Sequence, residues 1–268
     1  MSKLFIWDFD GVISDSLIEC VTVAKVAEAL LKSPNTVITL SNLHRICSPQ
    51  YIIPLYDQLK PLRPFIVKGQ DYLWQHFNFE KFEDIPKSFA DYRERFKSIW
   101  NEKTDKDYEE AFYRARKLLA NLMKEEYFAL FRPYNGSIYA FRTSLKRHNN
   151  YVCTARDQKA VMLLFGENNI IFPREKILSK DYNGLEPNDG WSKAKQIRHI
   201  LSMEGGNEQS FTIVEDQVKA PMDLKDECPN LSVVYAAYGY GLDEDWDNSG
   251  LKNIKKVIDP SKLIYAMM

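Results

Sequence analysis

The sequence predicts an α/β fold, with a Rossmann-like parallel sheet core that is interrupted by a mostly α-helical insert. From about residue 133 onward, short apolar runs alternate with amphipathic segments, as expected where helices cover both faces of a parallel sheet. Residues 17–132 instead space their apolar residues three and four apart, which is typical of helices. One more apolar run, KLFIW at residues 3–7, stands before this helical segment and resembles the strands that follow it.

Composition limits the classes of function. The chain has 268 residues, of which 45% are hydrophobic and 27% charged, enough for a large core and a second domain. A net charge of -1 gives no general attraction to nucleic acid or membranes, so an anionic ligand needs a local site. The N-terminal apolar run is too short for a signal peptide, and no run reaches the roughly 20 residues that span a bilayer. We therefore expect a cytoplasmic monomer or homodimer. The four cysteines lie far apart, which favours free thiols over disulfides or zinc.

Taken in order, the patterns predict the following elements. In the insert, helices are expected at 19–31, 71–77, 88–100 and 107–131, with a loop at 60–65. In the second part, strands are expected at 150–155, 169–172, 210–216, 231–239 and 255–259, with helices at 137–148, 159–166, 193–203 and 261–268 and a loop at 181–190. The turn residues of RPYNGS at 132–137 mark the return to the core. The predicted domains are thus a core of residues 1–16 and 133–268 and an insert of residues 17–132.

Two acids follow the first strand directly. Asp8 and Asp10 stand two positions apart before Gly11, in LFIWDFDG. Neighbouring carboxylates repel each other unless a cation offsets them or one of them holds a proton. The pair therefore indicates a metal, a shared proton or both. On these residues alone, a helix N-cap followed by a turn is an equally good interpretation.

Other polar residues occur where later strands are expected to end, the edge at which parallel sheets bind ligands. Thr154 ends one apolar run, Glu215 and Asp216 end another, and Lys193 begins the helix before the latter. Each has an ordinary structural interpretation by itself: a turn for Thr154, helix-dipole partners for the acids and a solvated helix position for Lys193. Their order along the chain favours a common site.

This ordered set resembles the haloacid dehalogenase superfamily of phosphohydrolases, across the whole α/β part. DFDGVISDS is similar to that family's first motif, which implies that Asp8 is the nucleophile and Asp10 the general acid and base. By the same resemblance, Thr154 hydrogen-bonds the transferring phosphoryl group and Lys193 is the lysine of the third motif. The tail from AAYGYGLDEDW onward resembles members similar to phosphoglycolate phosphatase.

The resemblance also implies a Mg²⁺ site. Its ligands would be Asp8, the main-chain carbonyl of Asp10, and the acidic pair Glu215 and Asp216, which suit a hard cation. The common pattern places a second acid about four residues after the first, but the next acid after Asp216 is Asp223. The sequence instead resembles members that place the two acids side by side, so Asp223 is a doubtful ligand. Lys176, Lys180 and Lys195 compete with Lys193 for the third motif. Three neighbours of the motif residues are assigned to the substrate's phosphate: Gly11, Ala155 and Arg156.

The expected function is hydrolysis of a small phosphorylated metabolite or nucleotide, through an aspartyl-phosphate intermediate. A sugar phosphomutase or a non-catalytic phosphate-binding protein remains an alternative. Dehalogenase activity is disfavoured, because its chemistry does without an acid at the position of Asp10. A receiver domain is disfavoured as well, because it would be a shorter chain. The insert stands where the family carries its cap domain, although it is longer than the usual small helical cap. Its aromatic residues either stack on a nucleobase or form the core of the insert, and their helical spacing favours the core.

Overall fold

The computed structural model describes residues 3–35, 37–180, 192–206 and 210–267. The predicted loop at 181–190 therefore lies outside the described residues. The chain forms two compact units: residues 1–15 together with 132–268, which we call the α/β unit, and residues 16–131, which we call the helical unit.

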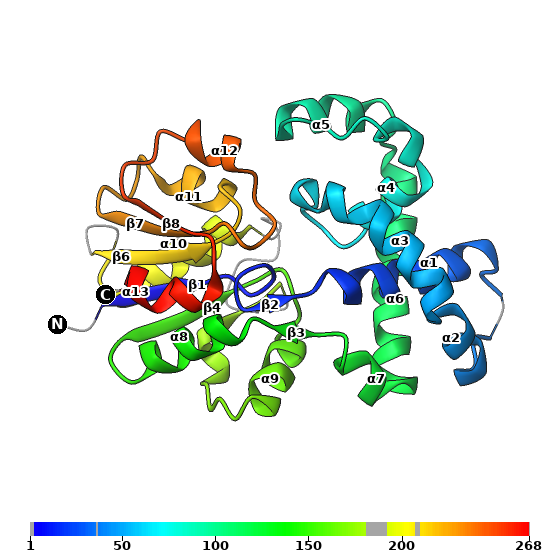
Figure 1. The fold of residues 1–268 in the computed structure, drawn as a ribbon, viewed down its shortest axis with the longest axis horizontal. Helices are drawn as coiled ribbons and strands as arrows, with labels where there is room; N and C mark the ends of the chain where they lie inside the picture. The colour runs from blue at the N-terminus through cyan, green and yellow to red at the C-terminus, as the bar shows by residue number, and fades with distance from the viewer. Residues whose placement is uncertain (1–2, 36, 181–191, 207–209, 268) are drawn as a thin grey trace. The chain divides into compact units, whose positions relative to one another are not determined.

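The α/β unit is built on a six-stranded sheet (Figure 1). Across the sheet the strands are β5 (Ile177–Leu178), β4 (Asn149–Cys153), β1 (Leu4–Trp7), β6 (Phe211–Glu215), β7 (Leu231–Ala236) and β8 (Ile254–Val257). All their pairings are parallel. The N-terminal strand β1 is central, because it pairs with β4 on one side and with β6 on the other. The predicted α/β fold with a parallel sheet is confirmed.

Helices cover both faces of this sheet (Figure 1). They are α8 (Asn135–Leu145), α9 (Gln158–Glu167), α10 (Lys193–Glu204), α11 (Lys219–Leu224), α12 (Asp243–Asp247) and α13 (Leu263–Met267), with 3₁₀ helices at Arg174–Lys176 and Pro260–Lys262. Successive side chains of β1 point to opposite faces. Ile6 packs in a buried cluster with Ile197 of α10, whereas Trp7 meets Phe141 of α8 at a ring distance of 5.1 Å. The sheet is thus buried on both sides, as its continuous apolar strands require.

Two predicted segments differ from the structure in their type of secondary structure. The apolar run 169–172 is not a strand; Asn169 has a left-handed backbone (φ 50°), and Phe172 is buried by packing on Phe141 and Phe165 without strand pairing. The strand at this edge is β5, five residues further on. The prediction of a loop at 60–65 is also wrong, because this segment forms the 3₁₀ helix η1 (Lys60–Phe65), which tolerates its prolines while burying Leu62 and Phe65.

A short antiparallel ribbon marks where the chain leaves and re-enters the α/β unit. Strand β2 (Ser14–Asp15) pairs with β3 (Arg132–Pro133). The N–H of Tyr134 extends the pairing by donating to the carbonyl of Ile13 at 2.9 Å. Both crossings of the chain between the units therefore start from adjacent strands.

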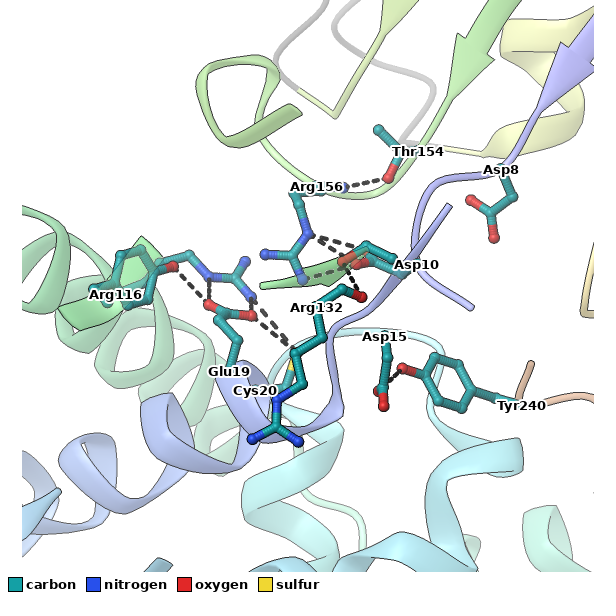
Figure 2. Close-up of polar contacts among 12 residues, drawn as sticks. Asp8, Asp10, Asp15, Glu19, Cys20, Arg116, Arg132, Thr154, Arg156 and Tyr240 are labelled. Atoms are coloured by element: carbon teal, nitrogen blue, oxygen red, sulfur yellow. Dashed lines mark hydrogen bonds and ion pairs between the residues drawn. The ribbon is translucent and has the colours of Figure 1, made fainter. Parts of the chain in front are cut away.

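The helical unit consists of α1 (Leu17–Lys32), α2 (Leu40–Ile46), α3 (Pro49–Leu59), η1, α4 (Asp71–Phe77), η2 (Phe79–Lys81), α5 (Phe89–Lys97), α6 (Glu102–Leu122) and α7 (Lys124–Phe128). Within it, the buried carboxylate of Glu19 accepts hydrogen bonds from Arg116 (Figure 2). It also accepts one from Tyr127, so that it joins α1, α6 and α7. Trp74 and Tyr92 are 3% and 4% exposed, so these two aromatic residues belong to the core of the unit.

All four cysteines are free thiols. Among the described residues, no helix combines the length and apolar character that a membrane span needs.

Candidate active site

The loop after β1 presents Asp8 and Asp10 at the carboxyl edge of the sheet. Asp8 is 7% exposed, and its N–H donates to the carbonyl of Val214 on the neighbouring strand β6. The chain then turns back on itself, since the N–H groups of Ile13 and Ser14 both donate to the carbonyl of Phe9. Gly11 allows this turn because its backbone is left-handed, at φ 90°.

Three buried acids meet at this edge. Asp8, Glu215 and Asp216 each place a carboxylate oxygen within 4.8 Å of the others. Lys193 lies among them, with its ammonium 2.9 Å from Oδ1 of Asp8 and 2.7 Å from Oε2 of Glu215. Its single charge offsets only part of three potential negative charges, and this excess of carboxylates is a setting suited to a divalent cation.

Burial controls the ionisation of this group. Desolvation, reinforced by the charge of Glu215, raises the pKa of Asp8 well above its usual range. Desolvation likewise raises the pKa of Glu215, although Lys193 opposes the shift. Burial disfavours the charged form of Lys193, but the two carboxylates outweigh it, so its pKa is raised and it stays cationic. Without a further cation, Asp8 and Glu215 hold protons more tightly than free carboxyl groups do.

Asp216 is enclosed by three glycines. A Cβ atom at Gly11 would stand 2.2 Å from its Oδ2, one at Gly239 2.6 Å from its Cβ, and one at Gly241 1.8 Å from its carbonyl oxygen. The N–H of Tyr240 donates to Oδ2 at 2.8 Å. Any larger residue at these glycine positions would displace Asp216, so the close packing fixes where this acid lies.

Thr154 and Arg156 follow β4. The Thr154 hydroxyl oxygen accepts from the N–H of Arg156 at 3.0 Å, which is the ordinary turn that the sequence allowed (Figure 2). That bond uses the oxygen as an acceptor and leaves the hydroxyl proton able to donate to a ligand. The structural and the predicted functional interpretations of Thr154 are therefore compatible.

Asp10 forms an ion pair with the guanidinium of Arg156. Nε of Arg156 lies 2.9 Å from Oδ1 of Asp10 and another guanidinium nitrogen 2.8 Å from the same oxygen (Figure 2). The guanidinium favours the ionised form of the Asp10 carboxylate. The other acidic side chains of the site, Glu215 and Asp216, lie beside Asp8. The assignment of Arg156 to the substrate's phosphate stays a prediction beside this observed ion pair.

The remaining candidate residues occupy different positions in the α/β unit. Lys176 reaches Oδ1 of Asn149, at the opposite end of β4. Lys195 follows Lys193 by two positions on α10 and so projects from a different side of the helix. Asp223 is an exposed residue of α11 and is not part of the acid cluster. Lys180 follows β5, and Ala155 is partly buried between Thr154 and Arg156.

Sequence reasoning missed the contribution of the segment after β7. Tyr240 and Gly239 contact Asp216, while the hydroxyl of Tyr238 donates to the carbonyl of Val12 at 3.1 Å. The signal was available, because AAYGYG follows an apolar strand of the same parallel sheet and therefore ends at the same edge.

No family model and no curated protein sequence matches this chain. Solved structures do match it over nearly their whole lengths. A haloacid dehalogenase-like hydrolase family protein from Streptococcus pneumoniae aligns with a TM-score of 0.61 at 12% identity, covering 100% of this chain and 99% of that one. A predicted phosphoglycolate phosphatase from Haemophilus somnus gives 0.57 at 15% identity (100% and 98%), and a predicted phosphatase from Clostridium acetobutylicum gives 0.56 at 15% (96% and 95%). The chain therefore has the fold of the haloacid dehalogenase-like hydrolases.

Proposed function

We propose that this protein is a Mg²⁺-dependent phosphatase that hydrolyses phosphate monoesters through an aspartyl-phosphate at Asp8. The observation that carries the proposal is the position of Asp8. It follows the central strand, contacts Lys193 and lies in a buried acid cluster with Glu215 and Asp216. The names of the similar structures, which include two predicted phosphatases, support the same class of reaction.

The acid cluster fits a magnesium ion. Its donors are buried carboxylate oxygens, the ligand type that hard divalent cations prefer, and the charge of Lys193 leaves them with an excess of negative charge. Asp8, Asp216 and the main-chain carbonyl of Asp10 would hold the ion, with Glu215 beside them. When bound, Mg²⁺ would neutralise charge on the phosphoryl oxygens.

The side chains divide the work in two steps. In the first, an oxygen of Asp8 attacks phosphorus, the bond to the leaving-group oxygen breaks, and Asp10 donates the proton that this oxygen needs. In the second, Asp10 takes a proton from water, whose oxygen attacks the phosphorus and releases inorganic phosphate from Asp8. Lys193 holds Asp8 in place and offsets negative charge, and the Thr154 hydroxyl donates to the phosphoryl group.

The substrate belongs to the class of small phosphorylated metabolites or nucleotides. In this proposal Gly11 and Ala155 help to bind its phosphate, and the helical unit acts as the cap that selects among substrates. The protein would act in the cytoplasm, as a monomer or homodimer.

The test replaces the nucleophile. Purified Asp8→Asn should lose turnover by about 10⁴-fold or more in an assay of phosphate release from a panel of phosphorylated metabolites with Mg²⁺. Asn has nearly the same size as Asp, so the fold should persist by circular dichroism. The matched control is Asp223→Asn, which removes an exposed acid of α11 and should leave activity unchanged.

Near wild-type activity of Asp8→Asn would contradict the proposal. So would phosphate that stays on an organic product, because that outcome identifies a mutase. Absence of phosphate release by the wild-type protein across the panel would favour a binding protein.

A further inference from the structure

We propose that Tyr240 is a positioning residue that ties the loop carrying the catalytic acids to the metal-binding acid Asp216. The catalytic part of this inference rests on the proposed function. Residues 237–241, which connect β7 to the segment before α12, are called the tyrosine loop below. Residues 8–15, from Asp8 to the end of β2, are called the acid loop.

Two hydrogen bonds of Tyr240 come from different parts of the residue. Its hydroxyl donates to Oδ1 of Asp15 at 2.6 Å, a short bond of the strong, charge-assisted kind (Figure 2). Its main-chain N–H donates to Oδ2 of Asp216 at 2.8 Å. One residue thus bridges the last residue of the acid loop and the acid at the end of β6. A substitution that removes only the ring hydroxyl therefore breaks the bond to Asp15 and keeps the main-chain bond to Asp216.

Other contacts hold the tyrosine loop against the acid loop. Gly239 approaches the carbonyl of Gly11 so closely that a Cβ atom would stand 2.4 Å from that oxygen. The hydroxyl of Tyr238 donates to the carbonyl of Val12 and also meets Oγ of Ser137 at 2.8 Å. The tyrosine loop therefore supports the acid loop at its middle and at its end, and Tyr240 supplies the support at Asp15.

Support at Asp15 matters because of where this residue stands. Asp15 belongs to β2, opposite Arg132 of β3, at the point where the chain passes out of the α/β unit and returns to it. Motion of the chain beyond Asp15 would reach Asp10 along a short stretch of backbone. The Tyr240 bond isolates the two catalytic acids from that motion, and this keeps the nucleophile and the acid in the geometry that in-line attack requires.

The decisive variant is Tyr240→Phe, which removes the bonds of the hydroxyl to Asp15 and to the Tyr134 side chain and keeps the N–H on Asp216. We expect kcat to fall about tenfold, a loss of the size that misplacing a reacting group produces, while KM and the Mg²⁺ concentration for half activity change less than about twofold. Asp15→Ala should have the same effect, and Asp15→Asn should retain most activity because its amide oxygen still accepts the bond. The double variant Tyr240→Phe with Asp15→Ala should be no worse than either single variant.

The matched control is Tyr151→Phe. The Tyr151 hydroxyl also bonds a carboxylate, Oε1 of Glu204 at 2.5 Å, but this partner ends α10, and neither residue is part of the acid loop or the tyrosine loop. The control should leave kcat unchanged. A tenfold loss in this control, or additive losses in the double variant, would overturn the positioning role, since a general loss of stability would then explain the effect.

Hydrogen exchange gives a readout that is independent of activity. In Tyr240→Phe, the amides of Ser14 and Tyr134, which are bonded within the acid loop and ribbon, should exchange at least about tenfold faster, whereas Tyr151→Phe should not alter them. Unchanged protection in Tyr240→Phe would refute the tether even if activity fell. Faster exchange in a protein whose wild type releases no phosphate would keep the tether and refute the proposed function instead.

Discussion

At the scale of single residues, the contact between Arg156 and Asp10 has the largest consequence for the chemistry. A general acid must be protonated when the leaving group departs, yet the adjacent guanidinium favours the ionised carboxylate. The proposed phosphatase must therefore take up a proton at Asp10 before the first step. Its kcat/KM should accordingly fall as pH rises, and Arg156 should set where that fall occurs.

Arg156→Met tests this role. Removing the cation makes protonation of Asp10 easier, so the alkaline fall of the kcat/KM profile should move upward by about one pH unit. Arg156→Lys keeps a positive charge and should move the profile less. Arg142→Met, at an exposed arginine of α8, serves as the control. If Arg156 binds substrate phosphate instead, the profile will stay in place, while KM and the inhibition constant of inorganic phosphate will rise.

At the scale of secondary-structure elements, the start of α4 depends on a buried acid. Oδ2 of Asp71 accepts from the N–H groups of Val67 and Lys68, both at 2.8 Å, and so holds the turn that precedes the helix. The residue is 9% exposed, and desolvation raises the pKa of Asp71 to about 6 despite these two bonds. The Asp71 carboxylate is thus a good acceptor for these two N–H groups, but its negative charge is unfavourable in a buried position.

Asp71→Asn should remove the unfavourable buried charge. Between about pH 4 and 6, folded wild-type protein holds a proton that the unfolded chain has released, so its stability falls as pH rises through this window. An amide side chain stays uncharged across the window and has no such loss. We expect Asp71→Asn to exceed wild type by up to about 3 kcal/mol at pH 7.5 and by little at pH 4.5, measured by urea unfolding.

Asp91→Asn provides a control with the opposite sign. Asp91 lies in the first turn of α5 and likewise accepts from a main-chain N–H before its helix, that of Lys87. Its contact with Arg95, however, lowers the pKa of this partly exposed carboxyl. Its substitution should therefore reduce stability at pH 7.5. An Asp71→Asn protein that is less stable than wild type at pH 7.5 would show that the charge of Asp71 is needed at the start of α4.

At the scale of the whole molecule, the chain consists of two units that each have a buried core. Two separate unfolding transitions are therefore expected, and ligand binding should stabilise only the unit that contains the site. The acid cluster lies in the α/β unit. In the absence of metal, the raised pKa values of Asp8 and Glu215 should make this unit less stable as pH rises, because the folded state then gives up protons that it holds tightly.

Magnesium should reverse that effect. At about 100 times its dissociation constant, Mg²⁺ should raise the Tm of the α/β transition by about 5–10 °C at pH 8, as followed by calorimetry. The rise should be smaller at pH 5.5, where protons compete for the same carboxylates. Asp216→Asn should lose it. A Tm shift that is independent of pH, or that survives in Asp216→Asn, would contradict the assignment of the metal to this cluster.

The sequence alone determined the features that depend on residues close together along the chain. Buried strands and amphipathic helices leave local periodicities, so the parallel sheet, the helical insert and the acids that follow β1 and β6 could be read directly. It also favoured Lys193 over Lys176, because Lys193 opens the helix before β6. The errors were local as well: the apolar run 169–172 packs without pairing, and periodicity cannot separate a packed coil from a short strand.

Only the tertiary structure decided which distant side chains meet. Arg156 pairs with Asp10, and Tyr240 reaches both Asp15 and Asp216, across separations of up to 225 residues. Sequence patterns predict that these segments share one edge of the sheet, but they contain no distances between side chains. The contacts follow from the order of the strands, which places β1 between β4 and β6, and from three glycines that let the loops approach closely. Ionisation at the site depends on the burial and charge pairing that this packing creates, which is why it could not be predicted from composition or spacing.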